Sequence, residues 1–175
     1  MTPLFDFAQT PDAASRWRTL NDTVMGGVSE SRFEATDDGA VFRGTVSLDR
    51  GGGFASVRAP ESTYDLSDAD SIRLQLRGDG KRYKLTLYTH PGGRVSYRAP
   101  FEAPPGGAPT AWTTVQVPFD TLTPYRRGQP MPGAPPFDPS RVRTLGFLIG
   151  DKQDGPFRLA VRRIASVTRS SASPW

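Results

Sequence analysis

The segment SIRLQLRGDGKRYKLTLYT, residues 71–89, indicates the fold most directly. Apolar residues occupy every second position from 72 to 76 and again from 83 to 87, as they do in strands that bury one face. Gly78-Asp79-Gly80 lies between the two runs and has the composition of a tight turn. We therefore expect two antiparallel strands joined as a β-hairpin at this turn, the reading we prefer to an integrin-type Arg-Gly-Asp motif.

Comparable short runs lie on both sides of this segment. The 18 glycines and 17 prolines interrupt the chain too often for long helices. Two further turns, 37–39 and 49–52, are expected to close hairpins of their own. Residues 123–140 contain six of the prolines and predict a surface loop. The expected strands are 29–36, 41–48, 53–58, 71–77, 82–89, 95–102, 112–119, 144–150 and 157–167.

One short N-terminal helix is also expected. Thr10 is suited to cap it and Pro11 to its first position, and Ala13, Ala14, Trp17 and Leu20 fall on one helical face. About ten strands and one short helix predict an all-β chain folded as an antiparallel sandwich or barrel. At 175 residues the chain has the length of one domain. We expect that domain to span residues 1–168, with 169–175 as a loose C-terminal tail.

Composition argues against most catalytic and metal chemistry. The chain has no cysteine and one histidine, His90, so disulfides, thiolate zinc sites and sites with two imidazoles are excluded. No nucleophile elbow accompanies His90. Asp22 with Asp151 or Asp154 would act as a glycosidase pair only at a separation of about 5–9 Å, and a turn such as 151–155 lacks the spacing of a known calcium loop. We therefore predict no catalytic residues, no metal and no cofactor.

Two features predict a cytoplasmic protein without a membrane span. No run approaches the roughly 18–20 apolar residues that a bilayer requires. The first seventeen residues have neither a basic segment nor an apolar core of the secretory type.

The charge has two interpretations. A net charge of +4 rests on nineteen arginines and only three lysines, which fits either codon usage in a G- and C-rich genome or an anionic partner. If their strands are neighbours, five cations form a basic stripe with Tyr88 inside it, suited to acidic protein, phosphate or single-stranded nucleic acid. A solvated outer face is the alternative. The five cations are Arg82, Lys84, Arg98, Arg158 and Arg162.

The run from Asn21 to Ser29, NDTVMGGVS, is the most unusual local feature. Its paired glycines allow backbone with positive φ, and Asn21 and Asp22 can accept hydrogen bonds from nearby amides. It fits a structural latch that closes one end of the sandwich. It also fits a loop that contacts a ligand or partner through Asn21 and Asp22.

These residues resemble the complex I intermediate-associated protein 30 family. Trp17 followed by LNDTVMGGVS, residues 20–29, carries the family signature, and the order of later segments agrees. Those segments are FRGTVSL (42–48), GGFASVR (52–58), RGDGKRY (77–83), Trp112 with VPF (117–119), RG (127–128), LGFLI (145–149), DKQ (151–153) and GPF (155–157).

The resemblance implies a galactose-binding-like jelly roll, related in shape to carbohydrate-binding modules. It implies a non-enzymatic assembly chaperone that holds respiratory complex I intermediates, here as a stand-alone bacterial-type member. It provides no catalytic residues. The partner- or ligand-binding residues that we carry over, with their expected neighbours, are Asn21, Asp22, Met25, Gly26, Gly27, Ser29, Asp79, Lys81, Tyr83, Asp151 and Gln153.

Two other functions stay open. A carbohydrate-binding module would stack sugar rings on aromatic side chains, although some of these have core-facing parity. A nucleic-acid-binding module would use the basic stripe and bind with steep salt dependence. The aromatic candidates are Tyr83, Tyr88, Tyr97, Trp112 and Tyr125.

Overall fold

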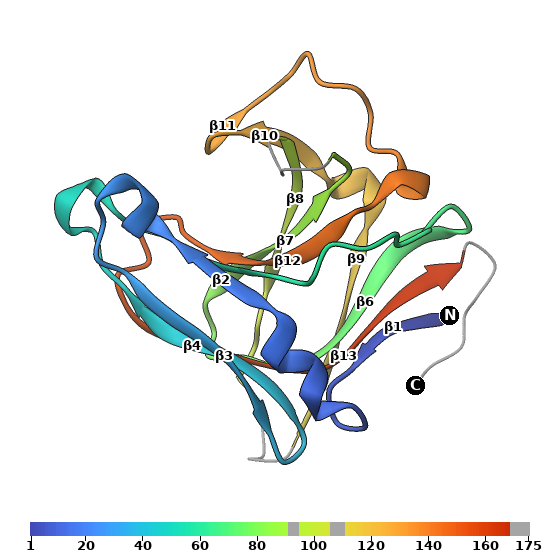
Figure 1. Cartoon of the computed structure of the whole chain (residues 1–175), viewed down its shortest axis with the longest axis horizontal. Coiled ribbons are helices and arrows are strands. Elements are labelled where there is room, and N and C mark those ends of the chain that lie inside the picture. The colour runs from blue at the N-terminus through green and yellow to red at the C-terminus, as the bar shows by residue number, and fades with distance from the viewer. Residues whose placement is uncertain (91–94, 106–110, 169–175) are drawn as a thin grey trace.

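A computed structural model describes residues 1–90, 95–105 and 111–168, without the side chains of Val24 and Met25. The expected tail, 169–175, lies outside these residues. Two antiparallel sheets pack face to face as a sandwich (Figure 1), which confirms the all-β prediction. The described residues form thirteen strands rather than about ten.

The first sheet has the order β3-β4-β13-β6-β9, and β1 pairs with β13 as well. The second has the order β11-β10-β8-β7-β12-β5-β2. The strands of the first sheet are β1 (Thr2–Asp6), β3 (Glu30–Thr36), β4 (Gly39–Val46), β6 (Ala69–Arg77), β9 (Thr113–Pro118) and β13 (Gly155–Thr168). Those of the second sheet are β2 (Arg18–Asn21), β5 (Ala55–Arg58), β7 (Arg82–Tyr88), β8 (Val95–Glu102), β10 (Thr123–Arg126), β11 (Gln129–Pro130) and β12 (Thr144–Ile149).

The turn at residues 78–80 does not close a hairpin. β6 belongs to the first sheet and β7 to the second, so the chain crosses between sheets there. Asp79 fixes the crossing, because its Oδ2 accepts hydrogen bonds from Tyr83 Oη at 3.0 Å and from the Arg158 amide at 2.8 Å. The alternation of apolar and polar residues gives each strand one apolar face. Both a hairpin within one sheet and a crossing between two sheets are compatible with this alternation. Residues 49–52 likewise join β4 to β5 across the sheets.

One of the expected hairpins is confirmed, and a second hairpin lies further along the chain. β3 and β4 pair from Glu30↔Thr45 to Thr36↔Gly39, around the turn predicted at 37–39. β7 and β8 pair from Arg82↔Glu102 to Tyr88↔Ser96, and residues 91–94 between them lie outside the described part.

The expected N-terminal helix is a short 3₁₀ segment, η1 (Pro11–Arg16), and Thr10 makes no side-chain capping bond to it. The chain turns extended at Trp17, so that Leu20 lies on β2 instead. The strands that were not expected, β1, β2, β10 and β11, are short or lie near prolines. The other 3₁₀ segments are η2 (Asp22–Met25), η3 (Asp49–Gly51), η4 (Phe119–Thr121) and η5 (Pro139–Arg141).

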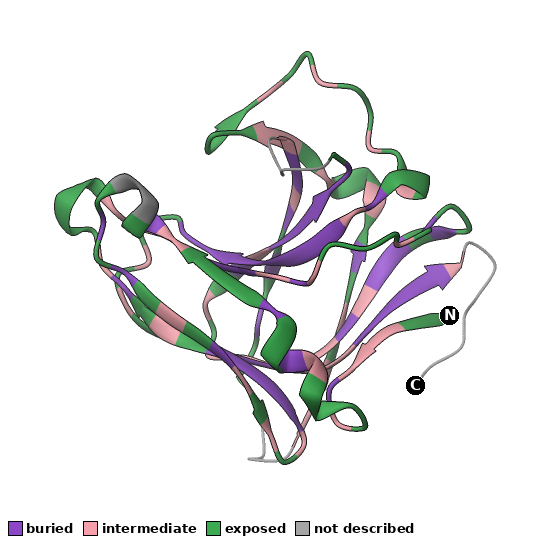
Figure 2. Cartoon of the chain, viewed as in Figure 1, coloured by how far each residue is buried: buried purple, intermediate pink, exposed green. Residues whose placement is uncertain are grey.

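The core lies between the sheets and is closed by aromatic side chains. Trp17 stacks on Phe33 with ring centroids 4.9 Å apart and meets Phe7 edge-on at 5.6 Å. Figure 2 shows buried residues on strands of both sheets and exposed residues mainly in connecting segments. Burial of each such side chain stabilises the fold by about 1.5–3 kcal/mol. Within the described residues, no helix has the length and hydrophobicity needed to cross a bilayer.

Candidate functional site

Three connecting segments meet at one end of the sandwich, and they include the signature loop. This loop (21–29) contains η2, and the β4–β5 connection (47–54) contains η3. The Gly53 amide donates to the Asp22 carboxylate at 2.6 Å, which joins these two segments. The β12–β13 connection (150–154) is adjacent, since a Cβ built on Gly150 would lie 3.8 Å from the carbonyl oxygen of Gly53. We call this surface the loop end; its first two segments lie together in Figure 1.

The carboxylate of Asp22 organises the loop end. The side chain is fully buried. Oδ1 accepts a hydrogen bond from the Ser29 amide at 2.9 Å, and Oδ2 accepts from Ser29 Oγ at 2.5 Å. Oδ2 also accepts from the amides of Gly53 and Phe54, at 2.6 and 3.2 Å. Four donors thus converge on one side chain. Two belong to Ser29, which is 7 residues from Asp22, and two are the amides of Gly53 and Phe54, which are 31 and 32 residues away.

These donors control the titration of Asp22. Burial raises the pKa of this carboxyl, but the hydrogen bonds from Ser29, Gly53 and Phe54 outweigh burial and hold the pKa below its usual value of 3.8. Asp22 is therefore a carboxylate at neutral pH.

Two glycines leave the space that this carboxylate occupies. A Cβ on Gly27 would lie 2.5 Å from Asp22 Cγ, and one on Gly52 would lie 2.5 Å from Asp22 Oδ2. Gly26 ends η2 in the left-handed conformation, with φ +86°. The glycines of the signature thus allow the chain to wrap closely around an anion.

The other signature residues surround this centre. Asn21 is half-buried, and its Oδ1 accepts from Ser31 Oγ at 2.7 Å and from the Ser56 amide at 3.4 Å. Ser29 is buried, and its Oγ accepts a hydrogen bond from the Ser47 amide at 2.9 Å. The predicted role of the Met25 side chain lies outside the described part. These placements favour the latch interpretation for Asp22 and Ser29, since neither presents its side chain to solvent.

The two segments predicted as neighbours of the signature do contact each other. The Gln153 side chain accepts from the Arg82 amide at 3.0 Å and donates to the Arg82 carbonyl at 2.7 Å. Lys81 Nζ donates to the carbonyl of Pro156 at 2.6 Å. Asp151 lies 3.5 Å from Lys84 Nζ. Gln153 thus anchors the β12–β13 connection to the start of β7.

Tyr83 is a core residue rather than a surface contact. Its ring is buried, and its hydroxyl reaches Asp79. Burial raises the pKa of this phenol, and the negative charge of Asp79 and the hydrogen bond to it raise it further.

Two large apolar side chains of the loop end are exposed, and a third, Leu20, directly precedes it on β2. Leu20, Val28 and Leu48 are 38%, 41% and 41% exposed, and they are the exposed large hydrophobic residues of the described part of the chain. Ser29 and Ser47, which are hydrogen-bonded to each other, follow Val28 and precede Leu48. Sequence analysis missed these three residues, because periodicity does not show which apolar side chains lie outside the core.

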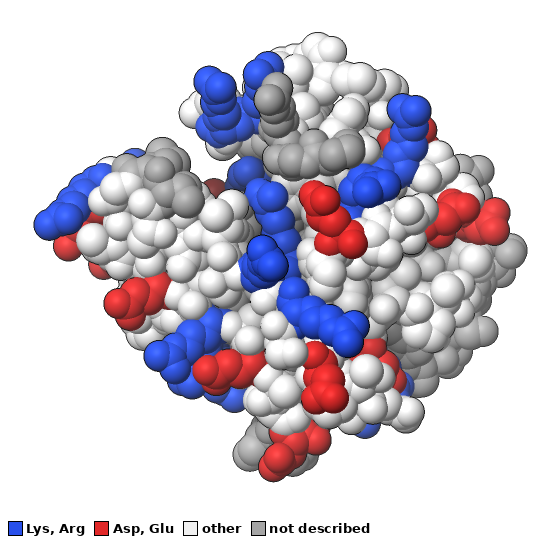
Figure 3. All heavy atoms as spheres, in the orientation of Figure 1, with Lys and Arg blue, Asp and Glu red and all other residues white. Residues whose placement is uncertain are grey.

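The five predicted cations do not form one stripe. Arg82, Lys84 and Arg98 lie on β7 and β8 of the second sheet, whereas Arg158 and Arg162 lie on β13 of the first. The expectation that these strands are neighbours is wrong, because the chain crosses between the sheets at both 78–80 and 150–155. Figure 3 nevertheless shows a line of basic side chains across one face of the molecule.

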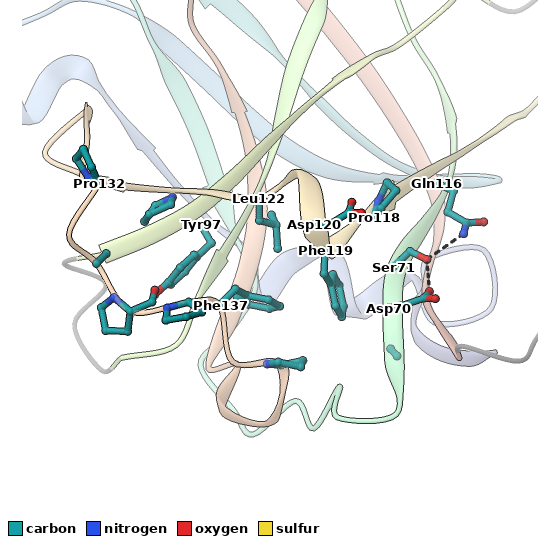
Figure 4. Close-up of a pocket in the computed structure, with 16 residues that line it drawn as sticks. Asp70, Ser71, Tyr97, Gln116, Pro118, Phe119, Asp120, Leu122, Pro132 and Phe137 are labelled. Atoms are coloured by element: carbon teal, nitrogen blue, oxygen red, sulfur yellow. Dashed lines mark hydrogen bonds between the residues drawn. The ribbon is translucent and has the colours of Figure 1, made fainter.

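A second candidate site is a pocket beside the proline-rich segment, with a volume of about 780 Å³. Figure 4 shows Tyr97, Phe119, Leu122 and Phe137 around its apolar part. Tyr97 Oη donates to the carbonyl of Pro135 at 2.8 Å and holds the segment in place. At the other end Ser71 Oγ donates to Asp70 at 2.7 Å and accepts from Gln116 at 2.9 Å, so its polar groups are satisfied within the protein. Several aromatic residues among the prolines were the available sequence signal.

The described residues offer few arrangements suited to catalysis or to metal binding. No group of three or more potential metal ligands occurs among them. His90 is exposed, and its Nδ1 lies 3.1 Å from Thr89 Oγ1. Asp22 is enclosed by donors, while Asp151 and Asp154 are exposed.

Comparison with known proteins gives both family and fold matches. The family model described as complex I intermediate-associated protein 30 matches residues 5–161. The mitochondrial protein of this name from Drosophila melanogaster is 29% identical over 90% of this chain and 60% of its own length. The Mus musculus protein is 25% identical over 87% of this chain and 52% of its own length. The chain thus spans between half and two thirds of these relatives.

Among solved structures, the fold is similar to a family 11 carbohydrate-binding module from Clostridium thermocellum, solved in complex with a β-1,3-1,4-mixed-linked tetrasaccharide. The TM-score is 0.64 with 16% identity, over 95% of this chain and 96% of that one. At this identity the match concerns the fold alone.

Proposed function

Since the chain belongs to the complex I intermediate-associated protein 30 family, we propose that it is a non-enzymatic binding module that engages an assembly intermediate of respiratory complex I. The names of its relatives describe association with such intermediates. The proposal extends that association to this chain. It assigns the contact to the loop end.

The observation that carries the proposal is the exposure of Val28 and Leu48 at this end, with Leu20 exposed directly before it on β2. Exposed apolar side chains that gather at one end of a domain favour protein contact there, because water is released when a partner covers them. The latch centred on Asp22 holds the segments that present Val28 and Leu48. Asp22 then acts as a positioning residue, and the apolar side chains make the contact.

Carbohydrate binding is favoured only by the fold. Sugar rings stack on open aromatic faces, and the five aromatic candidates do not offer them. Tyr83 and Tyr97 are buried. Arg58 lies over Tyr88 at 4.1 Å, Arg77 over Trp112 at 4.4 Å, and Arg98 over Tyr125 at 4.9 Å.

The test is affinity capture of the tagged protein from its own cells after mild crosslinking, with complex I subunits measured by mass spectrometry. We expect Val28→Ser with Leu48→Ser to lose most of this recovery. The matched control, Val28→Ile with Leu48→Met, keeps the apolar surface and should keep the recovery. Both variants should melt within a few degrees of the wild type, since the two sites are exposed.

Absence of complex I subunits from the wild-type capture would contradict the assembly role. Equal recovery by the serine variant would contradict the assignment to the loop end. Replacing Asn21 and Asp22 by alanine would be a poor test, because the buried Asp22 carboxylate holds the loop together.

A further inference from the structure

The outward face of the second sheet carries a continuous row of paired residues that includes three arginines. Arg18 pairs with Arg58, and Arg58 pairs with Gly146. Gly146 pairs with Thr86, which pairs with Arg98. Directly paired residues of an antiparallel sheet project from the same face, so Arg18, Arg58 and Arg98 share this face. We call them the arginine row.

Among the described residues, the arginine row has no carboxylate partner. Arg58 makes no hydrogen bond or ion pair within this part of the chain, and its buried Nε is without an acceptor there. Arg98 Nε donates to the neutral hydroxyl of Ser96 at 2.9 Å. The adjacent Lys84 does have a partner, Asp151, at 3.5 Å. Arg143 and Arg162 also have a buried Nε without an acceptor, but the Nη atoms of Arg58 are not among these buried atoms and can meet an acceptor from outside the chain.

Aromatic rings hold these guanidinium groups in place. Arg58 Cζ lies 4.1 Å from the centroid of the Tyr88 ring, which is itself 3% exposed. Arg98 Cζ lies 4.9 Å from the centroid of Tyr125. Stacking of this kind fixes the guanidinium plane and leaves its N–H groups free to bind a carboxylate in bidentate geometry.

The charges of Arg58 and Arg98 also affect each other. Burial lowers the pKa of the Arg98 guanidinium, Tyr88 and Tyr125 oppose this effect, and the positive charge of Arg58 adds to it. An anion between Arg58 and Arg98 would relieve this repulsion.

We propose that the arginine row binds an extended acidic segment of a partner protein, with carboxylates on Arg58 and Arg98. The strands β5 and β8 lie three strand spacings apart, about 14 Å. The Arg58 guanidinium reaches over Tyr88 on β7, next to β8, so the two guanidinium groups lie closer together than their strands. An extended peptide rises about 3.4 Å per residue, so glutamates at positions i and i+2 project from one face about 7 Å apart and can meet the two arginines together.

The shape and chemistry of the face favour a peptide over other anions. Figure 3 shows an indentation between the lobe with η2 and η3 and the lobe with β10 and β11, with basic side chains at its inner end. A flat lipid surface would meet the lobes first, whereas an extended chain can enter between them. Uronic-acid sugars and nucleic-acid bases both use exposed ring faces for stacking, and here guanidinium groups cover Tyr88 and Tyr125.

The test measures binding of a fluorescent twelve-residue peptide that alternates glutamate and threonine, by anisotropy at low ionic strength. We expect saturable binding that Arg58→Gln with Arg98→Gln weakens about tenfold or more, since the charge-assisted hydrogen bonds to both guanidinium groups are lost. The control, Arg32→Gln with Arg158→Gln, removes the same charge from exposed sites of the first sheet and should change the affinity less than twofold.

Arg58→Lys with Arg98→Lys keeps the charge and removes the bidentate fork, so it should resemble the glutamine variant. Equal weakening by the Arg32/Arg158 control would show attraction by net charge alone and overturn the proposal. So would absence of peptide binding by the folded wild type. Tighter binding of oligogalacturonate or of an oligouridine, lost in the Arg58/Arg98 variant, would assign the row to an acidic polysaccharide or to RNA instead.

Discussion

The loop end contains a fully buried charged group and the arginine row a half-buried one, and the two groups are satisfied in opposite ways. The Asp22 carboxylate accepts four hydrogen bonds from its own chain. The Arg58 guanidinium rests on a tyrosine ring and has a buried nitrogen without an acceptor. A charge that the fold satisfies contributes to stability. A charge that the fold leaves unsatisfied is available to a partner.

Asp22→Asn is the strongest test of this difference. The amide would turn an NH₂ group toward amides or hydroxyls that now donate to a carboxylate, and buried donors without acceptors cost about 1–3 kcal/mol each. We expect the free energy of unfolding to fall by about 3 kcal/mol or more, measured by urea denaturation. Asp49→Asn, an exposed change in the adjacent η3, is the control. Equal stability of the two variants would contradict the interpretation of Asp22 as the latch of the loop end.

Gly27→Ala should have the next largest effect. Its Cβ would lie 2.5 Å from Asp22 Cγ, so the loop must move, and such overpacking typically costs about 1–3 kcal/mol. Gly133→Ala has no atom within 4 Å of the new Cβ and should cost much less. Thermal unfolding of both variants measures the difference, and a Gly27 variant as stable as the Gly133 variant would show that the carboxylate is loosely packed.

The pH dependence of stability distinguishes the effect of the Asp22 charge from the effect of the shape of its side chain. The pKa of Asp22 in the folded chain is below its usual value of 3.8. Its contribution is therefore fully present above that value and is lost as the pH falls through the folded pKa. Between pH 6 and pH 3 the wild type should lose more stability than Asp22→Asn, in parallel urea titrations. Parallel curves would mean that other acidic groups account for the loss.

Arg58→Gln should have the smallest effect on the fold. The side chain makes one cation–π contact, worth about 0.5–1 kcal/mol at partly exposed sites, and the change removes an unpaired charge. We expect the free energy of unfolding to change by less than about 1 kcal/mol. A loss as large as that of Asp22→Asn would make Arg58 a structural residue and end the contrast between the two regions.

The alternation around Leu74 and Leu85 correctly predicted strands, because burial of one face is a local property of the sequence. It could not assign β6 and β7 to different sheets, since the deciding contact joins Asp79 to the amide of Arg158, 79 residues away. Because β7 and β8 lie in one sheet and β13 in the other, the five cations of the expected basic stripe form two separate groups.

The candidate site was predicted in part for the same reason. The signature located the loop end, and the turn chemistry of Asp22 predicted that it accepts amide hydrogen bonds. Its full burial and the bond to Gly53 depend on packing between distant segments. The arginine row was predicted in part. Arg98 was among the predicted cations, but Arg58 was not, because its place in the row depends on the register between β5 and β12.

The position of β13 has a consequence for how the chain folds. This strand, residues 155–168, pairs with β1, β4 and β6, which come from much earlier in the sequence. Pairings of such sequence separation fold slowly, because a long loop must close before any contact forms. On the ribosome, β4 and β6 would each wait with one edge open to other chains. Until β13 is made, the chain thus presents an incomplete sheet whose open strand edges can pair with other chains.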